Sequence, residues 1–148
     1  MQDMPDSQAP ETIVAFDFGL RRIGVAVGQN ITGSASPLGI IGNGENGADF
    51  ARIAELIKSW RPGRLIVGMP MHVDGSPGDI EPDIQEFIAE LTRFNLPIDR
   101  VDERYSSQEA KQTLKKARQA GNRGRIKKEH IDSAAAVLIA ERYLLKTL

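Results

Sequence analysis

The first forty residues alternate between short apolar runs and glycine-containing connections, a pattern typical of strands joined by turns. Residues 12–18 and 23–29 are β-branched and aromatic, and the connection between them contains Gly19. This arrangement predicts two antiparallel strands joined by a hairpin. A third extended segment, about 35–41, contains Pro37, which cannot donate to a ladder, so we expect it at an edge of the sheet. The glycine- and asparagine-rich stretch 42–47 is expected to end this strand.

After residue 50 the period of the apolar positions changes, and segments with helical spacing alternate with short extended runs. The predicted elements are a helix at 50–60, a strand at 64–69, a helix at about 84–91, a strand at 97–103, a helix from a capping box at 106–109 to Gly121, and a helix at about 129–145. Three hairpin-type strands followed by α/β units predict a mixed five-stranded sheet flanked by helices. We expect residues 1–11 to be a disordered tail and residues 12–148 to form a single domain.

Composition narrows the class without naming a function. The chain has 148 residues, of which 41% are hydrophobic and 26% charged, as in ordinary globular proteins. It contains no cysteine, which excludes disulfides, cysteine-ligated metals and thiol nucleophiles and suits a reducing compartment. The polar N-terminal residues lack the features of a secretory signal, and the apolar run 134–140 is too short to span a membrane. We therefore expect a cytoplasmic protein.

Asp17 is the first residue that suggests chemistry, because it lies inside an otherwise apolar strand. An ionised carboxylate there is costly unless a cation or several donors compensate it. One interpretation is that Asp17 caps the following turn through its side chain. The other is that it is a metal ligand on a rigid strand.

Two further carboxylates have comparable positions. Glu103 closes the last predicted strand, at the edge where open α/β sheets bind ligands, although a salt bridge with Arg100 or Arg104 would also explain it.

Asp132 begins the last predicted helix, where an N-cap is the simpler explanation. However, Ala135, Ala136, Ile139 and Tyr143 follow it at helical spacing, so Asp132 should face the sheet.

Three inward carboxylates would repel one another and favour protonation unless a cation neutralised them. Mg²⁺ or Mn²⁺, hard ions that take oxygen ligands, would do so. The sequence therefore suggests a divalent-metal site formed by Asp17, Glu103 and Asp132.

Four sequence blocks in order resemble the YqgF family, also called RuvX, over nearly all of residues 12–145. The blocks are AFDFGLRRIGVAVG, IVGMPMHVDGS, VDERYSSQEA and HIDSAAAVLIAERYL. The resemblance implies a ribonuclease-H-like fold and a metal-dependent nuclease for structured nucleic acid, with Asp17, Glu103 and Asp132 as its catalytic acids. It also implies processing of the 5′ end of pre-16S rRNA in ribosome biogenesis, with Holliday junction resolution as the alternative, and places Arg22 and Arg104 as phosphate contacts.

Residues 111–128 hold eight basic residues and no acidic one, although the whole chain has a net charge of −1. We expect this segment to bind nucleic acid. Its candidate contacts are Lys111, Lys115 and Arg118 on one helix face, then Arg123, Arg125, Lys127 and Lys128. A solvated face that balances an acidic body is the alternative.

His72 and His130 stand where the family usually has asparagine and, nearby, lysine, and we expect both to be surface residues. Two other classes of protein stay open at this stage. One is an actin-like ATPase or sugar kinase, which would need a second domain, and the other is a non-catalytic ribosome-assembly module. The partner expected is pre-rRNA or branched DNA, bound by a monomer or weak homodimer.

Overall fold

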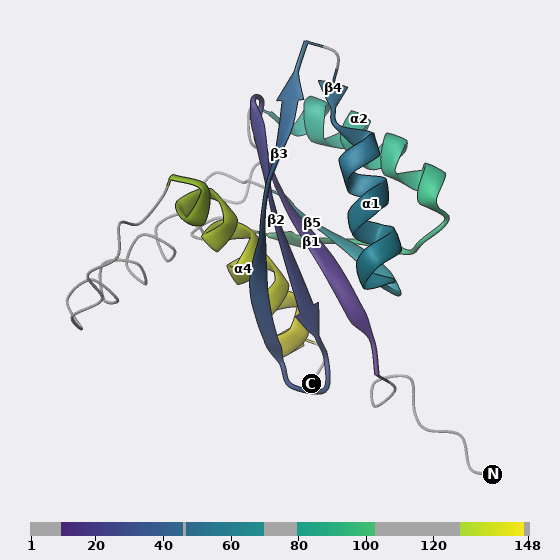
Figure 1. The fold of residues 1–148 in the computed structure, drawn as a ribbon, viewed down its shortest axis with the longest axis vertical. Coiled ribbons are helices and arrows are strands. Elements are labelled where there is room, and N and C mark those ends of the chain that lie inside the picture. Colours follow the sequence, from purple (N-terminus) through teal and green to yellow (C-terminus); the bar gives the residue numbers. More distant parts are fainter. Residues whose placement is uncertain (1–9, 46, 70–79, 103–127, 147–148) are drawn as a thin grey trace.

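A six-stranded mixed sheet separates two helices on one face from a third helix on the other (Figure 1). The structure is a computed structural model that describes residues 10–45, 47–69, 80–102 and 128–146. The strands lie in the order β4-β3-β2-β1-β5-β6. The elements are β1 Thr12–Phe18, β2 Arg22–Gln29, β3 Ser34–Gly44, β4 Gly47–Ala48, α1 Phe50–Trp60, β5 Arg64–Met69, α2 Glu81–Leu91, the 3₁₀ turn η2 Thr92–Phe94, β6 Ile98–Asp102 and α4 Lys128–Lys146.

The connections of the sheet are those that the sequence predicts. β1, β2 and β3 form consecutive antiparallel pairs, whereas β5 runs parallel to β1 and β6 runs parallel to β5. Tight connections suffice for the antiparallel pairs, while parallel neighbours need a crossover, which α1 and α2 provide. The predicted mixed α/β class is confirmed.

The strand count differs from the prediction, because β4 adds a sixth strand to the predicted five. β3 continues to Gly44, and β4 folds back onto Asn43 and Gly44. Gly47 has a φ of 86°, which glycine adopts readily, so the glycines build a short hairpin instead of ending the strand. Pro37 lies in β3 where its register with β2 shifts, and such an irregularity tolerates a residue without an N–H.

Each face of the sheet carries its own apolar cluster, because side chains alternate along a strand. Val14 and Phe16 of β1 pack with α1 and α2, whereas Ile13 and Ala15 pack with α4. The stripe predicted on the last helix is confirmed, since its members Ala135, Ala136, Ile139 and Tyr143 are all at least nine-tenths buried.

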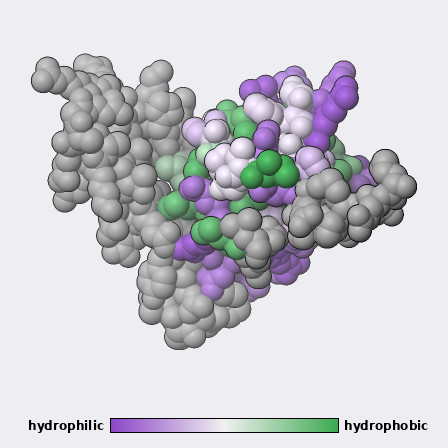
Figure 2. Space-filling view, turned by 90° about the horizontal axis from the view of Figure 1, so that it is seen from below, coloured by the Kyte–Doolittle hydropathy of each residue, from purple (hydrophilic) through white to green (hydrophobic). Residues whose placement is uncertain are grey.

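Large apolar side chains at the surface are scattered. Ile31, Trp60 and Leu145 are each more than 40% exposed. On the face shown in Figure 2, hydrophobic residues form small separate patches among hydrophilic ones. Isolated exposed apolar residues are normal for globular proteins. Within the described part of the chain, no helix combines the length and the apolar character that crossing a membrane requires.

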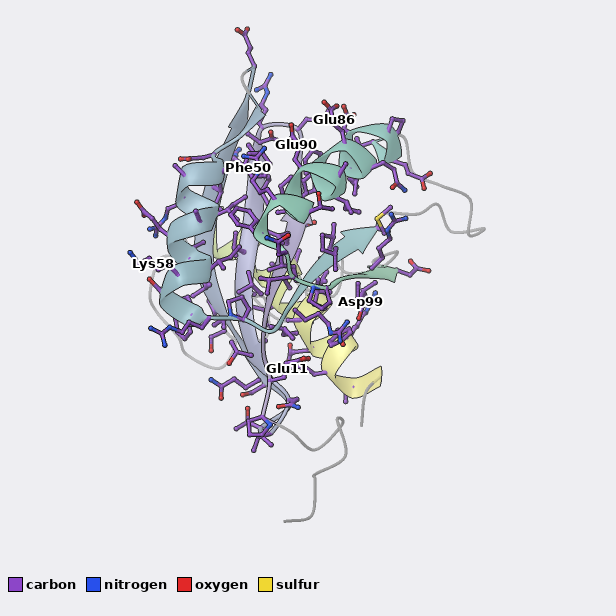
Figure 3. All side chains as sticks on the ribbon, turned by 90° about the vertical axis from the view of Figure 1, so that its right-hand side faces the viewer. Glu11, Phe50, Lys58, Glu86, Glu90 and Asp99 are labelled. Carbon is purple, nitrogen blue, oxygen red and sulfur yellow. The ribbon has the colours of Figure 1, made fainter. Side chains whose placement is uncertain are left out.

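A charged cluster joins the starts of β1, β5 and β6 to the end of α4. The Arg64 guanidinium lies 3.0 Å from an Asp99 carboxylate oxygen and 3.6 Å from one of Glu11, and the Tyr143 hydroxyl donates to Asp99. Figure 3 shows Glu11 and Asp99 beside this helix. Glu11 also donates its backbone N–H to Asn30 at 2.8 Å. The predicted disordered tail is therefore wrong at Glu11, which Asn30, just after β2, and Arg64 of β5 hold in place. Residues 1–9 lie outside the described residues.

This cluster predicts a loss of stability at alkaline pH. Burial raises the pKa of Tyr143 above its ordinary value of 10.0, and Asp99 raises it further. Burial alone would lower the pKa of Arg64, but the negative charges around the guanidinium outweigh it, so that pKa is raised too. A group whose pKa is higher in the folded than in the unfolded state stabilises the fold fully at pH values below its unfolded pKa. This contribution is lost as pH rises through its folded pKa.

Unfolding by urea should therefore require less denaturant as pH rises above about 10, the unfolded pKa of tyrosine. Tyr143→Phe removes the ionisable hydroxyl, so its stability should decline less steeply over this range. Parallel declines for both proteins would contradict this prediction.

Candidate active site

Asp17 lies near the C-terminal end of β1, the strand between β2 and β5 in the middle of the sheet. Its backbone pairs with Gly24 of β2, and its side chain is half-buried. Because Ile13 and Ala15 face α4, strand alternation directs Asp17 to the same face. The prediction that this carboxylate lies inside a strand is confirmed.

The C-terminal ends of β1, β5 and β6 lie at one edge of the sheet, because these three strands are parallel. β6 ends at Asp102, and Glu103 is the next residue in the sequence. Glu103 itself lies outside the described residues. Arg100, one of its alternative partners, donates to Gln85 of α2 at 3.0 Å.

Helix α4 runs across the face that Asp17 occupies. A Cβ added to Gly28 would lie 3.0 Å from Leu144 and 3.4 Å from Ile13, so the end of α4 covers the start of β1. Between Ile13 and Asp17, β1 covers about 13 Å at the usual spacing of a strand. The helix extends about 18 Å back to Asp132 at 1.5 Å per residue. The helix is therefore long enough to reach the level of Asp17, and Figure 1 shows it crossing this face of the sheet.

Asp132 is the fifth residue of α4, because the helix begins at Lys128. The N-cap explanation is therefore wrong, since four residues of the helix precede Asp132. Asp132 shares its spacing with the buried Ala135, Ala136 and Ile139. Its side chain lies outside the described residues.

Arg142 makes a contact that could not be predicted from the sequence. Its Nη1 donates to the backbone carbonyl of Asp102 at 2.9 Å. This bond ties α4 to the end of β6, next to Glu103. Residues 40 positions apart in sequence form it, so no local pattern could have indicated it.

Among the predicted nucleic-acid contacts, Arg22 is the first residue of β2 and is exposed. It lies two residues from Gly24, so its side chain is on the strand face that Asp17 occupies. Lys128 begins α4 and His130 follows in it, but the side chains of both are outside the described residues. The other predicted contacts, and His72, lie outside them as well; they are Arg104, Lys111, Lys115, Arg118, Arg123, Arg125 and Lys127.

A cavity of ≈ 470 Å³ opens on the opposite face of the sheet. Four carboxylates line it, from Glu45, Asp83, Glu86 and Glu90, together with Phe18 and Phe87. Figure 3 shows Glu86 and Glu90 on α2 near Phe50. Such a lining repels a polyanion, so this cavity does not suit nucleic acid.

The donor chemistry of Asp17 fits Mg²⁺ or Mn²⁺, because both ions prefer carboxylate oxygens. Over residues 10–45, 47–69, 80–102 and 128–146, no group of three or more His, Cys, Asp or Glu residues could hold a metal ion. The described residues therefore supply one of the three predicted ligands.

Comparisons with known proteins agree with this geometry. Thermus thermophilus RuvC, solved in complex with a Holliday junction substrate, superimposes with a TM-score of 0.57 at 13% identity, over 92% of this chain and 94% of that one. A second structure of Thermus thermophilus RuvC gives a TM-score of 0.55, also at 13% identity, over 92% of this chain and 97% of that one. At this identity the likeness shows the fold alone, which is ribonuclease-H-like.

The family model described as "RuvX: Holliday junction resolvase" matches residues 11–146. Two relatives named "Putative pre-16S rRNA nuclease", from Burkholderia lata and Paraburkholderia xenovorans, are each 45% identical over 134 residues. The alignments cover 90% of this chain and 88% and 87% of the relatives. The chain belongs to the RuvX family.

Proposed function

We propose that this chain is a metal-dependent nuclease that hydrolyses phosphodiester bonds in structured nucleic acid, and that it processes the 5′ end of pre-16S rRNA. The observation that carries the proposal is the Asp17 carboxylate, on the central strand of a ribonuclease-H-like sheet, on the face covered by α4. The names of the relatives at 45% identity support the choice of substrate.

In this proposal Asp17, Glu103 and Asp132 together hold divalent ions. Glu103 follows Asp102, the last residue of β6, directly in the sequence. Bound Mg²⁺ or Mn²⁺ supplies an activated water and stabilises the charge that develops on the phosphate. The protein's part is to hold the carboxylates on rigid elements. Arg142 would assist by fixing the end of β6 to α4.

The basic residues would bind the substrate backbone. Arg22 lies beside the Asp17 face, and Arg104 and the segment 111–128 follow Glu103 in the sequence. Phosphate contacts of this kind are independent of sequence and weaken as salt rises.

We also propose a domain organisation, an oligomeric state and a location for the protein. Residues 12–148 would form a single nuclease domain, acting as a monomer or weak homodimer. A role in rRNA processing places it in the cytoplasm.

Holliday junction resolution is the second candidate function, because the family description and the RuvC fold favour it. A competition assay separates the two. Labelled pre-16S leader RNA and a labelled four-way DNA junction are mixed with the protein and Mn²⁺, and both cleavage rates are followed. Faster cleavage of the RNA supports the proposal, whereas faster cleavage of the junction favours resolution. Binding without cleavage of either substrate would favour a non-catalytic assembly module.

A further inference from the structure

Asp17 stands between two glycines in a row that crosses the sheet. Gly24 is its partner on β2. On the other side Phe16 pairs with Val67, which places Asp17 beside Gly68 one residue further along β5. Beyond the glycines the row continues to Ile40 on β3 and Val101 on β6. Directly paired residues direct their side chains to one face, so the two positions paired with Asp17 on the neighbouring strands are both glycine.

Backbone conformation does not explain these two glycines. Among the described residues, the glycines with positive φ are Gly33, Gly39 and Gly47. Gly24 and Gly68 are both paired within ladders, Gly24 one residue before the register shift at Val25 and Ala26. Glycine weakens a strand interior, and its presence there often marks a place where a ligand or another backbone approaches closely.

Packing of α4 is the competing explanation, because both glycines are buried. Gly28 shows what such packing looks like: an added Cβ would lie 3.0 Å from the Leu144 side chain. Gly24 is four residues nearer to the Asp17 end of the sheet. A role in packing against α4 and a role in leaving room for a ligand therefore predict different effects of substituting these two glycines.

We propose that Gly24 and Gly68 keep the space on both sides of Asp17 clear for a phosphodiester backbone and the divalent ion that Asp17 holds. This inference rests on the proposed nuclease function. An ion at a carboxylate lies about 2.0–2.1 Å from the oxygen and carries further ligands around it. A methyl group at either glycine would lie about 4.5–5.5 Å from the Asp17 Cβ, where those ligands need room.

The test compares Gly24→Ala and Gly68→Ala with Gly42→Ala. Gly42 is a matched control, because it also lies in a strand and an added Cβ there meets no heavy atom within 4 Å. Three quantities are measured: the melting temperature, Mn²⁺ binding by calorimetry, and the rate of cleavage. We expect Gly24→Ala and Gly68→Ala to lose about 100-fold in cleavage, the size of effect that a misplacement of 1 Å can have. They should also bind Mn²⁺ more weakly, with melting temperatures close to that of Gly42→Ala.

Two results would overturn the inference. In one, both variants cleave and bind Mn²⁺ as Gly42→Ala does. In the other, their melting temperatures fall and cleavage falls only with the folded fraction, which would assign the glycines to packing against α4. If the wild-type chain cleaved no substrate, the proposed function would fail, but Mn²⁺ binding would still decide on the glycines. Weaker binding by Gly24→Ala would support clearance, and unchanged binding would contradict it.

Discussion

Asp17→Asn should lower phosphodiester cleavage by at least about 1,000-fold while the protein stays folded. Asparagine has the same shape as aspartate but lacks the negative charge that would hold a divalent ion. Metal ions contribute several kcal/mol of transition-state stabilisation, and each 1.36 kcal/mol is a factor of ten in rate. The backbone pairing of β1 with β2 does not depend on this side chain. Initial rates on labelled RNA with Mn²⁺, together with a thermal melt, measure both effects.

Glu86→Gln is the matched control for this experiment. It removes one carboxylate of the same charge from the cavity on the opposite face of the sheet. We expect wild-type cleavage from this variant, because an acidic cavity takes no part in binding a polyanion. Equal losses in Asp17→Asn and Glu86→Gln would show that overall charge, and not a site at Asp17, governs the reaction.

Ile139→Ala should cause a large loss of stability on the α4 side of the sheet. Ile139 is fully buried and packs in the cluster that joins α4 to Ile13, Ala15 and Ile66. Truncating a buried isoleucine to alanine costs about 2–5 kcal/mol. For a chain of this size, a loss of that order lowers the melting temperature by roughly 4–20 °C. Because α4 also contains Asp132, cleavage should fail at a lower temperature than in the wild type.

Leu145→Ala controls for the change of side-chain size on the same helix. Leu145 is 67% exposed, and most exposed substitutions change stability by no more than about 0.5 kcal/mol. Thermal and urea denaturation of both variants give the comparison. Equal losses at residues 139 and 145 would contradict the assignment of the buried face of α4.

The strands at 12–18 and 64–69 and the helix at 50–60 match the structure residue for residue. Their apolar runs are long, and turn residues mark their ends, so local pattern determines them. β4 was missed because it consists of two residues, Gly47 and Ala48, and depends on pairing with β3. Glu11 was assigned to a tail because its contacts with Asn30 and Arg64 come from distant parts of the chain.

Of the candidate site, the structure describes the strand position of Asp17 and the helix that contains Asp132. A charged residue in an apolar strand identified Asp17, and alternation along β1 gave its face. The offsets from Ala135 and Ile139 predict that Asp132 lies on the buried side of its helix, but its side chain is outside the described residues. The Arg142 bond to Asp102 and the glycine on each side of Asp17 could not be predicted, because strand order and register bring these residues together.

Mapping the 5′ ends made from a pre-16S rRNA precursor tests the proposed nuclease most directly. The purified chain is incubated with the precursor and Mn²⁺, with and without a chelator, beside Asp17→Asn. Primer extension should show a new discrete 5′ end with the wild-type chain and metal, and no such end with the chelator or with Asp17→Asn. Cleavage that persists in Asp17→Asn, or a precursor that is bound but left intact, would contradict a metal-dependent nuclease centred on this carboxylate.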